Sequence, residues 1–152
     1  MKESRAFPTR IAVLDDDIRF IRMVERGLEG AAMSVQPVTT LDPDEAVRVI
    51  ASYGCDAALV DVYMYGEAAG FDIVRLLRST PETYALPLLL TTGARREVGR
   101  QAAFLEEHRC EVLLKPFEIT DLVRTVAALI AGQGAPARAA PGLAAVRASI
   151  PA

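Results

Sequence analysis

Cysteine is scarce in this sequence, and its placement excludes the usual cysteine chemistry. Cys55 and Cys110 are the two cysteines among 152 residues, and neither belongs to a CxxC pair or another spacing typical of metal ligands. Each opens an apolar run, so we expect both to be reduced, half-buried packing residues. In the sheet predicted below they would lie roughly 9–10 Å apart, which exceeds the reach of a disulfide.

Long apolar stretches and an excess of basic charge are also missing. No stretch approaches the roughly 18 apolar residues of a membrane span, and no apolar core follows the charged start MKESRAFPTR. A net charge of −3 and a pI near 5.2 give no basic field for holding a phosphate backbone. These absences predict a cytoplasmic protein that neither spans a membrane nor binds nucleic acid directly.

The sequence does contain five short apolar runs separated by segments of helical character. Nearly continuous apolar runs suit strands covered on both faces, as in a parallel sheet between helices. The alternation predicts an α/β fold, a flavodoxin-like (βα)5 doubly wound sheet with strand order 2-1-3-4-5. Pro37 agrees, because a proline inside a strand is tolerated essentially only at a sheet edge, where this order puts the second strand. The runs are RIAVL (10–14), MSVQPVTT (33–40), CDAALVDV (55–62), LPLLLTT (86–92) and CEVLL (110–114).

The helical segments carry signals for their ends. In LDPDEAVRVIASYG we predict Asp42 as the N-cap, Glu45 at the capping-box position and Gly54 as the stop. The segment 97–109, EVGRQAAFLEEHR, is predicted as one helix. Gly99 weakens it, because glycine costs about 1 kcal/mol relative to alanine inside a helix.

The composition changes after residue 131, which suggests a boundary. We predict one folded domain over residues 1–131 and a tail over 132–152 that is rich in Ala, Gly and Pro and disordered. Within the tail, PGLAAVRASI offers a second interpretation. Leu143, Val146 and Ile150 would share one side of a short helix that docks on a partner.

Polar side chains stand near the ends of four predicted strands. Asp15 and Asp16 follow the first, Asp61 falls near the end of the third, Thr92 ends the fourth and Lys115 follows the fifth. Ligands of open parallel sheets bind at this edge. Like charges in contact repel by roughly 4 kcal/mol at a surface-like dielectric, so the acids need a cation, a proton or water. Among cations, Mg²⁺ prefers carboxylate oxygens. The chemistry suited to the set is phosphoryl transfer to a carboxylate, with Asp61 as nucleophile.

With these residues in place, residues 9–131 resemble the receiver domain of two-component response regulators, which has a chemotaxis-regulator-like fold. The motifs LDDD, ALVDVYM, LLTTGA and LLKPF carry the resemblance, in this order and at these separations. It implies that Asp61 is the phosphoacceptor, Thr92 the switch hydroxyl and Lys115 the lysine of the site. It implies a signalling domain that catalyses only its own phosphorylation and dephosphorylation.

The resemblance also implies a metal site and partners. Asp15 and Asp16 match the acidic pair that binds Mg²⁺ together with Asp61, and the backbone carbonyl of Tyr63 would be a further ligand. A sensor histidine kinase or phosphotransfer protein would supply the phosphoryl group. An unidentified output protein would receive the signal through the face of the last two helices, which also allows a homodimer. A single histidine, His108, argues against an internal phosphodonor.

Two other hypotheses stay open, and the first of them rests on three departures from the family pattern. Tyr65 stands where proline is usual, Gly70 lies one residue further from Asp61 than usual, and Val112 replaces the switch aromatic. These favour a receiver-like interaction module that works without phosphate. An aspartate-nucleophile phosphotransferase is the third hypothesis, since Asp15 and Asp17 have the two-residue spacing of such enzymes. Asp17 is otherwise expected to cap the first helix.

Overall fold

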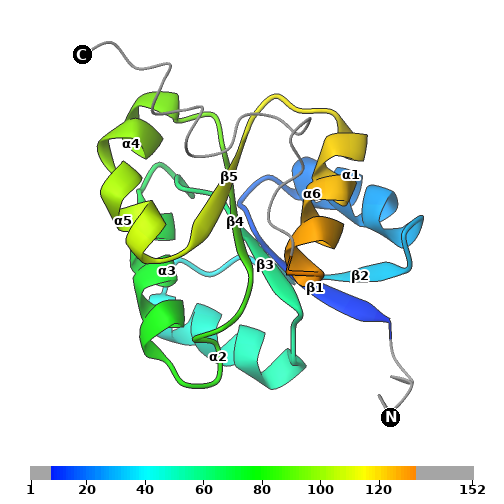
Figure 1. The fold of residues 1–152 in the computed structure, drawn as a ribbon, viewed down its shortest axis with the longest axis horizontal. Coiled ribbons are helices and arrows are strands. Elements are labelled where there is room, and N and C mark those ends of the chain that lie inside the picture. The colour runs from blue at the N-terminus through cyan, green and yellow to red at the C-terminus, as the bar shows by residue number, and fades with distance from the viewer. Residues whose placement is uncertain (1–7, 133–152) are drawn as a thin grey trace.

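The apolar runs form the strands of one parallel sheet, and helices connect them along the chain. The structure, a computed structural model, describes residues 8–132, so the predicted tail lies outside the described residues except for Gly132. Within that range no helix has the length and apolar character needed to cross a membrane. The elements (Figure 1) are β1 (Thr9–Leu14), α1 (Ile18–Glu29), β2 (Met33–Val38), α2 (Pro43–Tyr53), β3 (Ala57–Val60), α3 (Ala69–Ser79), β4 (Leu88–Thr92), α4 (Arg95–Arg100), α5 (Ala102–Glu107), β5 (Cys110–Leu114) and α6 (Ile119–Ile130).

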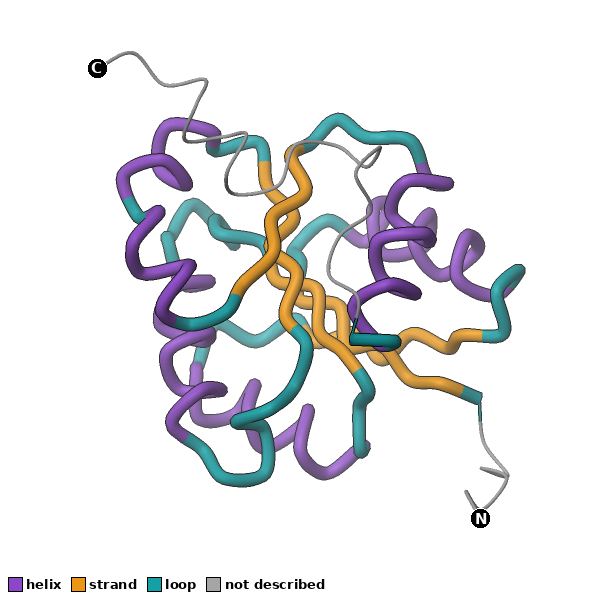
Figure 2. The backbone as a smooth tube through the Cα atoms, viewed as in Figure 1, coloured by secondary structure: helices purple, strands orange, loops and turns teal. Residues whose placement is uncertain are grey.

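The strand order is β2-β1-β3-β4-β5, which confirms the predicted topology. Pro37 lies in the edge strand β2, opposite Val13 of β1, where its missing N–H interrupts no inner ladder. Figure 2 shows the strands as a twisted layer between helices. One face of the sheet is covered by α1 and α6, and the other by α2, α3, α4 and α5 (Figure 1).

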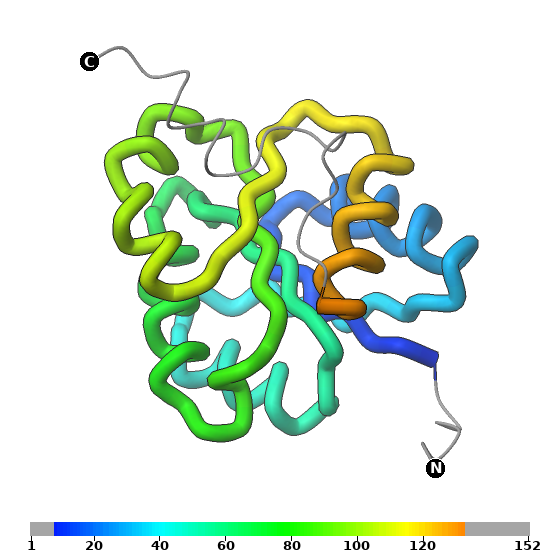
Figure 3. The backbone as a smooth tube through the Cα atoms, in the orientation of Figure 1, coloured from blue at the N-terminus to red at the C-terminus, as the bar shows by residue number. Residues whose placement is uncertain are grey.

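Alternate residues of a strand belong to two separate hydrophobic cores, one on each face of the sheet. In β1, Ile11 and Val13 belong to the core beneath α1 and α6, whereas Ala12 and Leu14 belong to the core on the other face. This two-sided burial explains why the runs are almost continuously apolar. Figure 3 shows α1 and α6 side by side although they are far apart in the sequence. Both cysteines are free thiols, as predicted. Cys55 is half-buried, but the half-buried prediction is wrong for Cys110, which is buried at the start of β5.

The ends of α2 follow the sequence, with one difference. Asp42 is the N-cap, and its carboxylate accepts the N–H of Asp44 at 3.0 Å. Gly54 ends the helix with a φ of 61°. The capping-box prediction for Glu45 is wrong in its partner, because its carboxylate accepts the Thr40 hydroxyl at 3.0 Å. The same hydroxyl oxygen accepts the N–H of Asp42 at 3.1 Å, so Thr40 stands between two groups that a capping box joins directly.

The segment 97–109 is not the single helix that we predicted. Gln101 separates α4 from α5 with φ −97° and ψ 16°. Apolar residues of both pieces are nevertheless buried, with Val98 and Leu105 fully enclosed. The break follows Gly99 by two residues, consistent with the low helix propensity of glycine.

Arg78 joins two loops to α3 in a way that the sequence did not indicate. Its buried guanidinium donates to backbone carbonyls of His108 at 2.7 Å, Tyr84 at 2.9 Å, Leu86 at 2.6 Å and Arg109 at 3.3 Å. Burial lowers the pKa of Arg78. Four carbonyl partners compensate the loss of water around the charge, since a buried charge must be hydrogen-bonded. Arg78 thereby fixes the segments that lead into β4 and β5.

Candidate functional site

Backbone hydrogen bonds extend the sheet beyond the ends of its strands and fix the first polar residues there. The N–H of Asp61, directly after β3, donates to the carbonyl of Leu14 at 3.0 Å. The N–H of Lys115, directly after β5, donates to the carbonyl of Thr92 at 2.9 Å. The predicted convergence of these residues at one edge of the sheet therefore begins in the backbone.

The ammonium group of Lys115 lies between two carboxylates. Its Nζ donates to Oδ2 of Asp15 at 2.8 Å and to Oδ2 of Asp61 at 3.1 Å. The side chains of Asp15, Asp61 and Lys115 are 2%, 12% and 27% exposed. Nζ also lies 3.9 Å from the centre of the Phe20 ring, a cation–π contact. The ammonium is thus held by three protein groups.

Backbone N–H groups contact the second carboxylate oxygen of Asp15 and of Asp61, and another backbone N–H binds a third acid, Asp16. The N–H of Asp17 donates to Oδ1 of Asp15 at 2.9 Å, and the N–H of Tyr63 lies 3.4 Å from Oδ1 of Asp61. The N–H of Tyr65 donates to Oδ2 of Asp16 at 2.8 Å. Asp17 itself is the N-cap of α1, as predicted. That role leaves its carboxylate bound to the N–H of residue 19.

Burial and the neighbouring charges shift two pKa values at the site. Burial raises the pKa of Asp61, the charge of Asp15 raises it further, and Lys115 opposes both without cancelling them. Burial lowers the pKa of Lys115, but its hydrogen bond to Asp15 and the attraction of both carboxylates outweigh burial and raise it. The site therefore favours a positive Lys115 and leaves the charge of Asp61 poorly compensated.

The acids fit a hard divalent cation. Asp15, Asp16 and Asp61 offer carboxylate oxygens within 4.8 Å of one another. Three carboxylates face the single ammonium of Lys115, so negative charge is in excess when all are ionised. Oxygen donors of this kind are the ligands that Mg²⁺ takes in proteins.

Thr92 and Val112 lie where the strand register predicts. Thr92 ends β4, is buried, and its hydroxyl oxygen accepts the N–H of Ala94 at 3.1 Å. The hydroxyl is therefore engaged with the link between β4 and α4. Val112 is 1% exposed in β5, so the position of the expected switch aromatic holds a buried aliphatic side chain.

The link from β3 to α3 contains a tight turn over residues 64–67. Beyond the turn, Gly70 packs against the backbone at the end of β3. A Cβ atom at Gly70 would come within 2.8 Å of the Cα of Val62, which real Cβ atoms do not tolerate. Glycine at this position therefore brings the start of α3 close to Asp61.

Three contributors to the site were missed by sequence reasoning. Phe20 lies over the ammonium of Lys115, and Phe117 packs edge-on against Phe20 with ring centres 6.0 Å apart. Phe117, directly after Lys115 and Pro116, was the one sequence signal for an aromatic group near the ammonium. The N–H of Tyr65 on Asp16 had no signal, because a backbone donor leaves none in the sequence.

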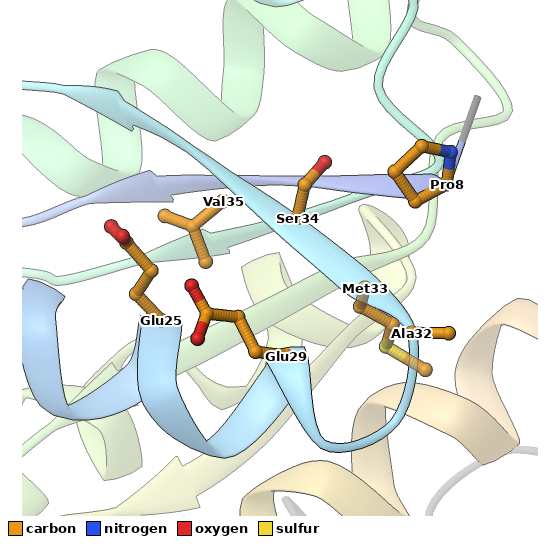
Figure 4. Close-up of a pocket in the computed structure, with 7 residues that line it drawn as sticks. All are labelled: Pro8, Glu25, Glu29, Ala32, Met33, Ser34 and Val35. Carbon is orange, nitrogen blue, oxygen red and sulfur yellow. The ribbon is translucent and has the colours of Figure 1, made fainter.

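A hollow of about 310 Å³ lies elsewhere, between α1 and the edge strand β2. Figure 4 shows Glu25 and Glu29 projecting from α1 beside Val35 of β2. None of its lining residues belongs to the predicted site, so its carboxylates are separate from the acid cluster.

The fold and the polar edge together define the class of doubly wound, flavodoxin-like domains with an acidic site at the carboxyl edge of the sheet, and comparison with known proteins narrows the class. The family model of the response regulator receiver domain matches residues 11–127. The chain therefore belongs to the response regulator receiver domain family of two-component systems. Such domains bind Mg²⁺ at an acidic pocket, in agreement with the cluster of aspartates.

Two curated relatives illustrate the similarity. The response regulator MprA of Mycolicibacterium vanbaalenii is 36% identical over 123 residues, covering 81% of this chain and 51% of that protein. The heme response regulator HssR of Staphylococcus haemolyticus is 29% identical over 118 residues, covering 78% of this chain and 50% of that protein. The chain thus spans about half the length of the curated relatives it matches.

Solved structures agree on the fold. A two-component response regulator of the LuxR family from Aurantimonas superposes with a TM-score of 0.71 at 22% identity, covering 86% of this chain and 91% of that chain. The Vibrio cholerae chemotaxis protein CheY4 gives a TM-score of 0.65 at 22% identity, covering 80% of this chain and 98% of that chain.

Proposed function

We propose that this receiver domain accepts a phosphoryl group on Asp61 from a sensor histidine kinase or phosphotransfer protein and passes its state to a separate output partner. The observation that carries the proposal is the Lys115 ammonium held between Asp15 and Asp61 beside a third carboxylate. We take residues 1–131 as the receiver domain, residues 132–152 as a tail, and the cytoplasm as the setting.

Asp61 is the proposed nucleophile. One of its carboxylate oxygens forms a bond to phosphorus while the bond from phosphorus to the donor's imidazole nitrogen breaks, and the electron pair of that bond returns to the imidazole. Lys115 and the Thr92 hydroxyl meet oxygens of the transferred group. Asp15 and Asp16, with Asp61 and the carbonyl of Tyr63, are the proposed ligands of Mg²⁺. When bound, the ion would supply positive charge to the phosphoryl oxygens.

The raised pKa of Asp61 has a consequence for the product. An ionised Asp61 lies in a poorly compensated, partly buried place, and a transferred phosphoryl group brings about −1.5 to −2 further charge. The phosphorylated state therefore needs the cation and Lys115 more than the resting state does. A rearrangement that brings Thr92 inward is the expected response, with a shift of the face formed by α4, β5 and α6.

A receiver-like module that works without phosphate is the second candidate. The observation that favours it is Val112, whose buried aliphatic side chain has no ring to reorient. This candidate predicts that an output partner binds wild type and Asp61→Asn equally, whether or not phosphodonor is present. The phosphotransferase hypothesis has less support, because the Asp17 carboxylate caps α1.

Intact mass spectrometry tests the proposal directly. The chain is incubated with a small phosphodonor such as acetyl phosphate and with Mg²⁺, and parallel samples contain a chelator or the variant Asp61→Asn. Asp72→Asn is the matched control, because Asp72 is an exposed aspartate paired with Arg75 on α3. We expect one phosphoryl group in wild type and Asp72→Asn only. Equal labelling of Asp61→Asn, or no labelling of folded wild type, would contradict the proposal.

A further inference from the structure

The turn after β3 has a backbone shape that suits one of its two central residues, Gly66, but not the other, Tyr65. Met64 and Glu67 exchange backbone hydrogen bonds, with N–H to carbonyl distances of 2.9 and 3.0 Å. Between them Tyr65 has a φ of 53° and Gly66 a φ of 79°. Positive φ at both central residues is the requirement of a type I′ turn, which Asn-Gly satisfies best. Tyr65 therefore occupies a conformation that is uncommon for a bulky residue.

The shape of this turn directs a backbone donor at the acid cluster. The N–H of Tyr65 lies 2.8 Å from Oδ2 of Asp16, a residue 49 positions earlier in the chain. A hydrogen bond to an ionised carboxylate is stronger than a neutral one. Tyr65 is 56% exposed, and the backbone N–H rather than the side chain makes the contact with Asp16.

Both flanks of the turn are anchored. The Met64 side chain is fully buried among core residues. On the other flank, the N–H of Gly70 donates to the carbonyl of Val62 at 3.0 Å. The turn is therefore held in place on both sides, and its conformation decides where the Tyr65 N–H points.

Asp16 needs a hydrogen-bond donor from the turn more than Asp15 and Asp61 do. Lys115 binds Asp15 and Asp61, whereas Asp16 is exposed. Its carboxylate lies within 4.8 Å of the other two, and like charges at that range repel. Left free, it would rotate toward water. Within residues 8–132, the Tyr65 N–H is the donor that holds it, and its Oδ1 has no hydrogen-bond partner.

We propose that the Tyr65–Gly66 turn positions Asp16 for a divalent cation by fixing Oδ2 and leaving Oδ1 as the ligand atom. The inference rests on the proposed function, since it concerns the same acidic site. Tyr65 acts through its N–H and is a positioning residue. A preorganised carboxylate loses less conformational entropy when it binds an ion, so the turn raises affinity for the ion.

Variants of the turn test this inference by the Mg²⁺ dissociation constant, measured by titration calorimetry. Gly66→Val places a β-branched residue at positive φ, which disrupts the turn. Tyr65→Asn keeps the N–H and gives the favoured Asn-Gly pair, and Tyr65→Phe removes only the phenol hydroxyl. We expect Gly66→Val to weaken binding by roughly tenfold, equivalent to about 1.4 kcal/mol. Tyr65→Phe should match wild type, and Tyr65→Asn should bind as tightly or more tightly.

A double-variant cycle with Asp16→Asn separates positioning from general damage. If the turn acts through Asp16, Gly66→Val has no further effect on affinity once Asp16 is replaced, because the two changes are coupled. Amide hydrogen exchange on wild type adds a measurement without any variant. The Tyr65 amide should stay protected with and without Mg²⁺, since Oδ2 remains its acceptor.

Several results would overturn the inference. These are equal affinity of folded Gly66→Val and wild type, tighter binding by Gly66→Val, loss of Tyr65 protection on adding Mg²⁺, or an undiminished effect in the Asp16→Asn background. If wild type is phosphorylated on Asp61 with Mg²⁺ and any of these occurs, only the positioning role fails. If wild type neither binds Mg²⁺ nor accepts a phosphoryl group, the proposed function fails with it.

Discussion

Replacing Lys115 with methionine removes the charge that faces two largely buried carboxylates while nearly keeping the length of the side chain. Its two hydrogen bonds, at 2.8 and 3.1 Å, have charged donors and acceptors. Bonds of this kind contribute about 1.5–3 kcal/mol each. The ammonium's own desolvation offsets part of that sum. We therefore expect the free energy of unfolding at pH 7 to fall by about 3–4 kcal/mol, near the lower end for breaking a buried pair.

Urea unfolding without metal, followed by circular dichroism, measures this loss. Arg75→Met is the matched control, because Arg75 pairs with Asp72 at 2.8 Å while both side chains are 60% or more exposed. An exposed pair of this kind contributes about 0.2–1 kcal/mol. A loss in Lys115→Met no larger than that in Arg75→Met would refute the view that Lys115 compensates the carboxylates.

The same variant has a pH dependence of known sign. Burial and Asp15 raise the pKa of Asp61, and without Lys115 only the backbone hydrogen bond from Tyr63 opposes them. An acid whose pKa is higher in the folded state gives most stability at low pH, and that stability is lost as pH rises through the folded value. The deficit of Lys115→Met should therefore shrink as pH falls toward the ordinary carboxylate range near 4. Adding Asp61→Asn should recover part of it at pH 7.

Three further predictions concern other parts of the chain. Arg78→Met should lower the free energy of unfolding by about 3–5 kcal/mol, because it leaves buried carbonyls unpaired; a loss below 1 kcal/mol in urea unfolding would contradict the role of Arg78. Tyr63 is 41% exposed beside Asp61, and its bulk should shield an acyl phosphate from water. Tyr63→Asn should then shorten the phosphoform lifetime in a mass-spectrometric decay assay, and an unchanged rate would exclude shielding. Burial raises the pKa of Cys55 to about 11 and of Cys110 to about 12. At pH 8 iodoacetamide should therefore label Cys55 slowly and Cys110 more slowly still, while rapid labelling of native Cys110 would show that it is not enclosed.

The fold could be predicted because its signals are local and agree with one another. Continuous apolar runs indicate strands buried on both faces, and Pro37 fits the edge position that the predicted order assigns to its strand. The polar residues could be brought together on paper because parallel strands end at a common edge. No more than this was needed to gather Asp15, Asp61 and Lys115.

The features that the sequence did not predict depend either on weak local preferences or on main-chain hydrogen-bonding groups. The Thr40 hydroxyl binds the Glu45 carboxylate in place of the capping box, and α4 ends with Gln101 as its C-cap. At both places small local preferences for alternative structures compete, and neither dominates. Arg78 donates to carbonyls of the main chain, and the main-chain N–H of Tyr65 donates to the Asp16 side chain. Main-chain donors and acceptors occur at almost every position, so sequence alone does not reveal which ones meet.

The place of Lys115 also gives the molecule a built-in chemical reporter. The chain has two lysines, Lys2 and Lys115, so an acylating reagent can meet few side-chain amines. Two carboxylates hold the Lys115 amine in its unreactive ammonium form. Any event that draws Asp15 or Asp61 away from it should increase its acylation, and a single peptide mass would then follow the state of the acidic edge.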